Sequence, residues 1–567
     1  MRSVVAVLVI TLILGGVAAG AYLATDRFLA SAYASRPALV NPEPDPGENG
    51  PPLTERLVVI IVDGWRTDAL SVMPFTDELW ARGASAMLHL TPPTYDAAGW
   101  ATLLTGATPE MLGLPLLPAP EWPGPRLPAG SLVGLAAAAG RACAVADHAA
   151  WEGYYQDGCA ARLFVPGDDA TADAQVAAGA RDMEQGRPAL MLVHFRHLAR
   201  AGRAYGATST RYLQAARALD DMIRQVAEPA LADEATIAVV SGHGLSDSGG
   251  FGGADLGSTQ VPFFLVGPGV IPGGYGTIRD VDVAPTLAAL IGLPAPPLAV
   301  GHVRYDMLAG DGPWQTGRHL RMAAQRLRLA EVYLANLGFG MGGLADLSDR
   351  VAQAERTFQS GDAEAAWQTA NAVLHEVNAL MREARQAALS RERGPRFVLA
   401  MIGLVLAGIL WGIWQRRRAW LTAVAAGLGI LVVHLAFWIG GGCYSLSSVA
   451  RVEEFLMATL WQAGLGALVA IALLVIWRVW RRPRGAPNIA IDVLGMAWAM
   501  MWIWAWPVAI GYWQHGAAVS WHIPDVTLAF WHLWGLTQLW SIPLFVLPIA
   551  WLLALIGVLT RRMWGSR

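Results

Sequence analysis

Asp63 comes directly after a run of β-branched residues at 58–62 and is followed by Gly64. A short apolar run of this kind is typical of a buried parallel strand. Open α/β folds bind ligands at the carboxyl ends of their strands, so the carboxylate of Asp63 is expected where a metal-binding side chain would lie. An ordinary strand followed by an Asx turn is the alternative that these residues leave open.

Histidines and an aspartate near two other apolar runs suggest a second metal site. His194 and His197 have His-x-x-His spacing near the end of one run, and Asp147 and His148 follow another. Imidazole nitrogens and carboxylate oxygens are common zinc ligands. Two histidines at this spacing are nevertheless more often structural, and that is the interpretation we favour.

The elements that position these residues alternate along the chain. From residue 56 to about 297, short β-branched runs alternate with alanine-rich helical stretches. This alternation predicts an α/β domain with a mainly parallel sheet. Strands are expected at 58–62, 142–146, 189–194, 237–241 and 263–266. From about 314 to 393, Ala, Leu, Glu, Gln and Arg recur at helical spacing, which predicts a stalk of two or three amphipathic helices.

Hydrophobic residues make up 54% of the 567 residues, which predicts that part of the chain lies in a membrane. An apolar run at 4–23 predicts an anchor helix, with a cleaved signal peptide as the alternative. About five further passes are expected, at 397–414, 421–439, 455–477, 489–513 and within 526–559. The last is long for one upright crossing, and Pro543 is expected to split it.

Arginine-rich segments at 416–418, 478–484 and 561–562 fall at alternate ends of the predicted passes. By the positive-inside rule, both termini are expected in the cytoplasm and the α/β domain outside it. The predicted organisation is an anchor at 1–30, a proline-rich linker at 31–55, the α/β domain at 56–313, the stalk at 314–395 and a polytopic α-helical membrane region at 396–567. A net charge of -3 argues against nucleic acid as a partner.

Two cysteines, Cys143 and Cys159, lie in the predicted outer domain. In an oxidising compartment a disulfide closing a loop of about 15 residues contributes roughly 3 kcal/mol to stability. The sequence leaves open whether the two cysteines are bonded.

Five motifs occur in an order that resembles the alkaline phosphatase superfamily. They are 59–68 with Asp63, 93–106 beginning Pro-Thr-Tyr-Asp, 241–247 with Ser-Gly-His-Gly, 261–269, and 282–290. Within that superfamily, the chain resembles most the branch that holds the type I phosphodiesterases/nucleotide pyrophosphatases and the ethanolamine-phosphate transferases of glycolipid anchor synthesis. The resemblance covers roughly residues 56 to 300 and implies an alkaline-phosphatase-like α/β fold.

The resemblance also implies two divalent metals, normally zinc, with a Ser or Thr nucleophile between them. Of seven family positions, Asp63 and His243 keep the expected metal ligands. The other five differ: Asp96 stands at the nucleophile position, and Gly242, Phe251, Ala199 and Arg203 stand at ligand positions. One Asp and one His cannot hold two zinc ions in a tetrahedral shell. We therefore expect no cofactor, or Zn²⁺ or Mn²⁺ if rearranged ligands keep the protein active.

Arg203 is expected to neutralise Asp63 or Asp96, or to bind a phosphate with bidentate geometry. The alternative is that Arg203 is merely exposed on a helix turn. Asp96 as a phosphoryl acceptor is a further, less favoured hypothesis. With Arg203, the residues His197 and Trp100 are expected to contact a bound ligand.

Two functions follow from these residues. The first is a membrane-anchored, non-catalytic phosphodiesterase-like protein that binds a ligand or serves as a scaffold or assembly protein. The second is an active hydrolase or transferase acting on a lipid- or glycan-linked phosphate. Polar residues within or beside the passes are expected to face a bundle interior or a headgroup pocket, namely His434, Gln462, Asp492, His532 and Gln538. A membrane lipid, a lipid-linked glycan or another membrane protein is therefore the expected partner.

Overall fold

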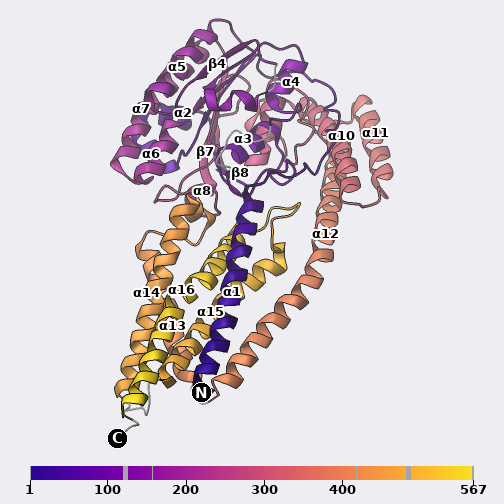
Figure 1. Cartoon of the computed structure of the whole chain (residues 1–567). Helices are drawn as coiled ribbons and strands as arrows, with labels where there is room; N and C mark the ends of the chain where they lie inside the picture. Colours follow the sequence, from indigo (N-terminus) through magenta and orange to yellow (C-terminus); the bar gives the residue numbers. More distant parts are fainter. Residues whose placement is uncertain (1, 119–125, 156–157, 417–418, 481–486, 565–567) are drawn as a thin grey trace. The chain divides into compact units, whose positions relative to one another are not determined.

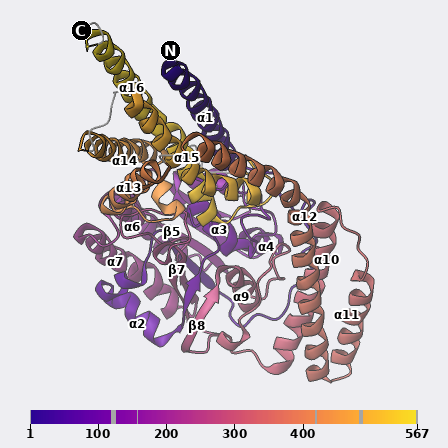
Figure 2. The same cartoon turned by 90° about the horizontal axis from the view of Figure 1, so that it is seen from below.

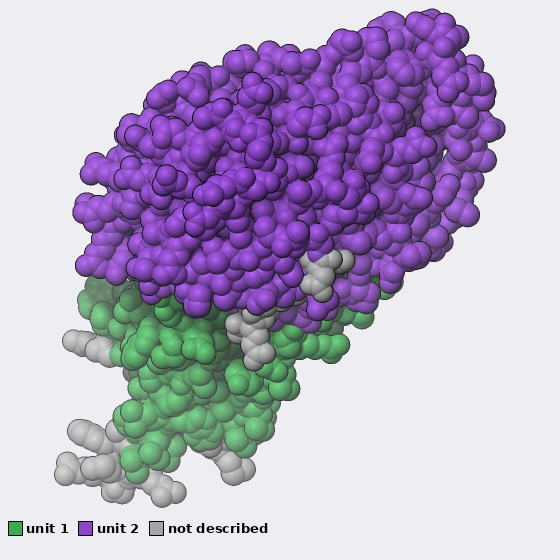
Figure 3. Space-filling view, turned by 90° about the horizontal axis from the view of Figure 1, so that it is seen from above, with its two compact units in different colours: residues 1–32, 390–567 green, residues 33–389 purple. Residues whose placement is uncertain are grey.

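The computed structural model describes residues 2–118, 126–155, 158–416, 419–480 and 487–564 (Figure 1). The chain divides into two compact units, coloured separately in Figure 3. Residues 33–389 form one unit, and residues 1–32 together with 390–567 form the other.

The first unit is built on a sheet that has eight strands within the described residues, in the order β4-β3-β5-β1-β6-β7-β2-β8. The neighbours from β4 to β6 pair in parallel, whereas β7 is antiparallel to both β6 and β2. The strands are β1 (Leu57–Val62), β2 (Ala84–His89), β3 (Cys143–His148), β4 (Ala161–Val165), β5 (Leu190–Phe195), β6 (Thr236–Val240), β7 (Gln260–Val266) and β8 (Gly273–Arg279). The predicted α/β class with a mainly parallel sheet is confirmed.

All residues of the central strands β1, β5 and β6 are buried, as their β-branched runs predict for strands covered on both faces. The five expected strands form within a few residues of the predicted bounds. The sequence analysis missed β2, β4 and β8. Strand β2 contains no β-branched residue, and β8 contains three glycines, so neither has the composition that reveals a strand.

Helices cover both faces of the sheet (Figures 1 and 2). One face carries α2 (Pro74–Arg82), α5 (Ala170–Glu184), α6 (His197–Tyr205) and α7 (Thr210–Ala232), which also contact one another. The other carries α3 (Asp96–Thr105), α4 (Leu132–Ala138) and α9 (Val283–Leu290), with the short α8 (Leu256–Thr259) preceding β7. Short 3₁₀ turns lie at Thr67–Val72, Ala149–Tyr154, Asp280–Asp282 and Tyr305–Met307.

The proline-rich segment is fastened to the α/β domain. The backbone N–H of Arg36 donates to Gly113 O at 2.7 Å, and that of Leu39 donates to Met111 O at 2.9 Å. After the α/β domain come α10 (Gly312–Asn336), α11 (Leu344–Gln359) and α12 (Ala363–Trp414). Helix α12 continues without a break through Pro395, so the expected stalk and the pass after it share one helix.

Within the described residues, six helices are long and apolar enough to cross a membrane, which makes the chain a multi-pass membrane protein. They are α1 (Arg2–Tyr33), α12, α13 (Ala419–Ile439), α14 (Val452–Trp480), α15 (Pro487–His515) and α16 (Val526–Trp564). Helices α13 to α16 pack together as a bundle, and a 3₁₀ turn lies at Leu446–Val449. The expected break at Pro543 does not occur, because α16 continues through Pro543 and Pro548.

Of the arginines that predict the orientation, Arg417, Arg418, Arg481, Arg482 and Arg484 lie outside the described residues. Arg478 pairs with the fully buried carboxylate of Asp492, so this expected intramembrane polar group faces a helix partner.

Candidate functional site

Three parallel strands carry the centre of the candidate site. Asp63 follows β1, and the neighbours of β1 in the sheet are β5, which carries His194, and β6, which precedes His243. The backbone N–H of Asp63 donates to Phe195 O at 3.0 Å, and that of Gly64 donates to His243 O at 2.9 Å. Because the strands are parallel, their carboxyl ends bring the three side chains to one edge of the sheet.

Asp96 is the first residue of α3 and lies among cationic and imidazole groups. Its Oδ1 accepts from Arg203 and lies 2.9 Å from Nε2 of His243, and its Oδ2 is 3.2 Å from Nη2 of Arg196. Burial raises the pKa of the Asp96 carboxyl, but Arg203 and His243, followed by Arg196, hold it well below its usual range. Asp96 is therefore a fixed anion in the position expected for a nucleophile.

Asp63 is fully buried and also has several polar partners. Its Oδ2 is 2.9 Å from Nε2 of His194 and 3.7 Å from Nε of Arg196. Its Oδ1 accepts from Nε1 of Trp100 at 3.3 Å. Burial raises the pKa of Asp63, whereas His194 lowers it, and the resulting pKa lies below the usual value.

His194 joins Asp63 to a second buried carboxylate. Its Nδ1 is 2.7 Å from Oδ1 of Asp147, whose Oδ2 accepts from the hydroxyl of Tyr155 at 2.8 Å. Burial lowers the pKa of His194, but the carboxylates of Asp147 and Asp63 raise it by a larger amount, so the pKa is about 9. Both ring nitrogens therefore donate, and His194 is a buried cation at neutral pH.

Arg203 contacts His243 and Phe251, two residues that the sequence analysis placed at metal-ligand positions. Its Nη2 is 3.3 Å from Nε2 of His243, and its guanidinium carbon is 4.0 Å from the ring centre of Phe251. Nδ1 of His243 donates to Gly244 O at 2.8 Å, which leaves Nε2 as the ring atom facing Arg203 and Asp96. The Arg203 side chain is 30% exposed.

The donor set does not fit two metal ions. Among the described residues, one group of three metal-type ligands has its atoms within 4.8 Å of one another, formed by Asp63, Asp96 and His243. The Nη2 atom of Arg203 contacts both Asp96 and His243, which also contact each other at 2.9 Å, so a permanent cation lies against two of these three donors. Two four-coordinate zinc ions need more ligands than these three residues supply.

Two of the altered positions, Gly242 and Ala199, are packed closely against neighbouring groups. A Cβ atom at Gly242 would lie 3.0 Å from Cδ1 of Trp100 and 3.4 Å from Oδ1 of Asp63. Ala199 packs so closely on Gly64 that a Cβ at Gly64 would lie 2.7 Å from the Ala199 Cα. Trp100 thus takes up space that an aspartate at position 242 would need.

The histidine metal site, which the sequence analysis weighed and did not favour, is not among the close groups of metal-type ligands in the described residues. Nε2 of His148 is 3.0 Å from Oδ1 of Asp173, and the backbone N–H of His197 donates to Oδ2 of the same residue at 3.0 Å. Within the described part of the chain, no hydrogen bond or ion pair joins the His197 ring to Asp63 or Asp96.

Sequence reasoning missed Arg196, and it considered His194 and Asp147 for a separate metal site while favouring a structural role for the histidines. A signal was available, because Asp147 and His194 lie in the carboxyl-terminal parts of β3 and β5, and Arg196 follows β5. Side chains at the ends of adjacent parallel strands meet at the same edge of a sheet.

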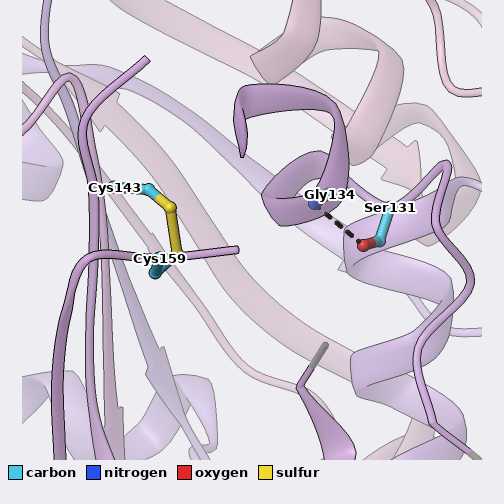
Figure 4. Close-up of a disulfide and its surroundings, with 4 residues drawn as sticks. All are labelled: Ser131, Gly134, Cys143 and Cys159. Atoms are coloured by element: carbon cyan, nitrogen blue, oxygen red, sulfur yellow. Dashed lines mark hydrogen bonds between the residues drawn. A yellow bond between two sulfur atoms is a disulfide. The ribbon is translucent and has the colours of Figure 1, made fainter. Parts of the chain in front are cut away.

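Cys143 and Cys159 are joined by a disulfide, which links β3 to the chain just before β4 (Figure 4). Nearby, the Ser131 hydroxyl caps α4 by accepting from the Gly134 N–H at 3.3 Å. The disulfide ties the segment that carries Tyr155 to the strand that carries Asp147.

Comparison with known proteins gives matches that centre on the same domain. The family model described as type I phosphodiesterase/nucleotide pyrophosphatase matches residues 57–115 and 136–252. The catalytic subunit of human GPI ethanolamine phosphate transferase 2 is 25% identical over 329 residues, which cover 52% of this chain and 32% of that protein. The catalytic subunit of human GPI ethanolamine phosphate transferase 3 is 24% identical over 321 residues, covering 53% and 29%. This chain therefore spans about a third of the length of these relatives.

A solved structure of murine ectonucleotide pyrophosphatase/phosphodiesterase 5, inactive and in complex with AMP, also matches. It is 13% identical, covers 45% of this chain and 100% of that chain, and has a TM-score of 0.37.

Proposed function

Because this chain belongs to the alkaline phosphatase superfamily, we propose that it is a membrane-anchored phosphodiesterase-like protein that has lost two-metal catalysis and binds a ligand or assembles a partner. Under this proposal the sheet edge around Asp63 is kept as a binding scaffold. The metal chemistry of the family is replaced by fixed ion pairs.

The observation that carries the proposal is the position of the Arg203 guanidinium. One of its nitrogens contacts both Asp96, at the nucleophile position, and His243, a retained ligand position. A permanent cation in this place supplies the positive charge that Asp96 requires, and it repels a divalent ion. Asp96 is also held in three ion pairs or hydrogen bonds, so it is a poor nucleophile.

Charge balance supports the same function. Three buried or partly buried carboxylates, those of Asp63, Asp96 and Asp147, face three cations. These are Arg196, Arg203 and protonated His194. Each of these carboxylates therefore has a cationic partner without a metal ion. An anionic ligand would reach this cluster at Arg203, whose side chain is 30% exposed and whose guanidinium makes charge-assisted hydrogen bonds.

The membrane helices support a ligand or partner in the bilayer. We propose that both termini are cytoplasmic and that the α/β domain is extracytoplasmic, as the arginine distribution in the sequence predicts. The two human relatives are named as GPI ethanolamine phosphate transferases, which favours a lipid or lipid-linked glycan as the molecule recognised.

The test uses the purified full-length chain in detergent or nanodiscs. Its bound zinc and manganese are measured after incubation with each ion and dialysis, and hydrolysis of bis-p-nitrophenyl phosphate is measured with and without the ions. We expect substoichiometric metal and no turnover above that of an Asp63→Asn variant. Near-stoichiometric metal together with turnover that Asp63→Asn abolishes would overturn the proposal.

One observation favours the second function, a metal-dependent hydrolase or transferase with rearranged ligands. The donor atoms of Asp63, Asp96 and His243 lie close enough together to suit one ion, provided that Arg203 moves away. This function predicts that Arg203→Ala increases metal binding by the full-length chain. Under the ion-pair function, the same substitution lowers stability, and the variant shows no phosphodiester hydrolysis with or without added ions.

A further inference from the structure

A cavity of about 310 Å³ lies among α13, α15 and α16, remote in sequence from the residues of the candidate site. Its wall is formed by Ile430 and His434 of α13, by Leu528 and Trp531 of α16, and by five residues of α15, namely Ile503, Trp504, Trp506, Pro507 and Ile510. All of these residues belong to helices that are long and apolar enough to cross a membrane.

The lining is almost entirely hydrocarbon and aromatic. Trp504, Trp506 and Trp531 contribute three indole rings, and none of the described lining residues carries a permanent charge. His434 is the most polar of them, and its ring already has partners. Its Nδ1 is 3.1 Å from the Tyr444 hydroxyl, and the ring stacks on Trp504 with an interplanar angle of 17°. A ligand of this cavity must therefore be apolar where it touches the wall.

The cavity opens through a surface that is itself apolar. The rim residues Ile503, Trp506 and Ile510 are 38%, 39% and 39% exposed. Apolar side chains exposed on a membrane-spanning helix face lipid, so the opening leads to the bilayer. From Ile503 to Ile510 the helix rises about 10 Å at 1.5 Å per residue, about a third of the hydrocarbon thickness of a bilayer.

The lining residues also lie toward one end of the bundle. They are closer to the last residues of α13 and α15, Ile439 and His515, and to the first residue of α16, Val526. The end of α14 that carries Arg478 belongs to the opposite side, because successive helices of the bundle run in alternate directions. With the orientation given under the proposed function, the cavity lies in the extracytoplasmic half of the membrane.

We propose that this cavity binds one hydrocarbon chain of a membrane lipid. Its apolar lining, its lateral opening and its length along α15 suit a segment of a single chain. The headgroup would lie beyond the cavity, toward the ends of α13 and α15. Only the assignment to the extracytoplasmic half rests on the proposed function, and the binding of a chain does not depend on whether the α/β domain is catalytic.

The experiment uses the full-length chain in phosphatidylcholine nanodiscs that contain a small fraction of phosphatidylcholine with a diazirine in its palmitoyl chain. After illumination, the crosslinked residues are mapped by peptide mass spectrometry. We expect crosslinks concentrated at Ile503 to Ile510 and at Leu528 to Trp531. Ile430→Trp should fill the cavity and remove most of them. The matched control is Leu431→Trp, because Leu431 is the next residue of α13 and is 52% exposed.

Ile510→Trp narrows the rim and provides a second test if Ile430→Trp does not fold. The same diazirine chain on phosphatidylglycerol should give the same crosslinks, because the cavity wall carries no charged group to select a headgroup. Crosslinks spread evenly over the exposed positions of all helices, or equal loss in Ile430→Trp and Leu431→Trp, would overturn the proposal. So would crosslinks that depend on the headgroup or that join two copies of the chain.

Discussion

Raising the pH from 6.5 to above 9 should destabilise the α/β domain through His194. Its pKa is about 9 in the folded chain, against about 6.5 for an unperturbed histidine. Below pH 6.5 both states carry the proton, and the full stabilisation is present. Between these values the folded state keeps the proton and the unfolded state loses it, so stability falls by about 1.4 kcal/mol per pH unit. The total loss is about 3 kcal/mol.

The free energy of unfolding can be measured by pulse proteolysis of the full-length chain in urea, following fragments of the α/β domain. The matched variant is His194→Gln, which keeps hydrogen-bonding groups near Asp63 and Asp147 but cannot titrate. Its profile should be lower at pH 6.5 and should lack the wild-type fall between pH 6.5 and 9. Parallel profiles for the two proteins, or a wild-type stability that rises over this range, would refute a buried imidazolium.

Three further predictions concern the same domain. Arg203→Met should lower the free energy of unfolding by about 2 kcal/mol, a value between those for exposed and buried ion pairs. Arg200→Met on the same helix should lower it by well under 1 kcal/mol, because Arg200 and its partner Asp168 are both exposed. Urea unfolding of both variants checks this. Cys143→Ser opens the disulfide and should cost about 3 kcal/mol, and a reductant should then leave the variant's stability unchanged. Gly99→Ala should cost about 3 kcal/mol or abolish expression, because its Cβ would lie 1.8 Å from Gly242 O; an unchanged melting temperature would contradict this close packing.

The fold could be predicted largely because its central strands are buried on both faces. Strands such as β1 and β5 therefore read as continuous apolar runs that sequence patterns reveal. Edge or glycine-rich strands lack that signal, and β8, with four exposed residues among its first five, is the clearest case. The membrane helices were equally visible in the sequence. The sequence did not reveal that α16 continues through Pro543, because neighbouring helices can compensate for the hydrogen bond that a proline removes.

The site was predictable only in part. The family resemblance pointed to Asp63, Asp96 and His243, and the structure brings their donor atoms within 4.8 Å of one another. The proximity of Arg203 to Asp96, 107 residues away in the chain, followed from the family register, and the structure joins the two in an ion pair. Arg196 was missed because an arginine after a strand is common, and its role depends on two carboxylates delivered by other elements.

The replacements at the site are physically coupled. Removing the metals from a family site would leave the carboxylates buried without countercharge, at a cost of several kcal/mol per group. In this chain Arg203 and Arg196 supply charge to Asp96, while His194 supplies it to Asp63. Each buried cation offsets its desolvation cost only when its carboxylate is present, and each buried carboxylate offsets its own cost only when its cation is present. The proposed loss of the metals requires a set of this kind, because it gives the carboxylates of Asp63 and Asp96 a cationic partner without a metal ion.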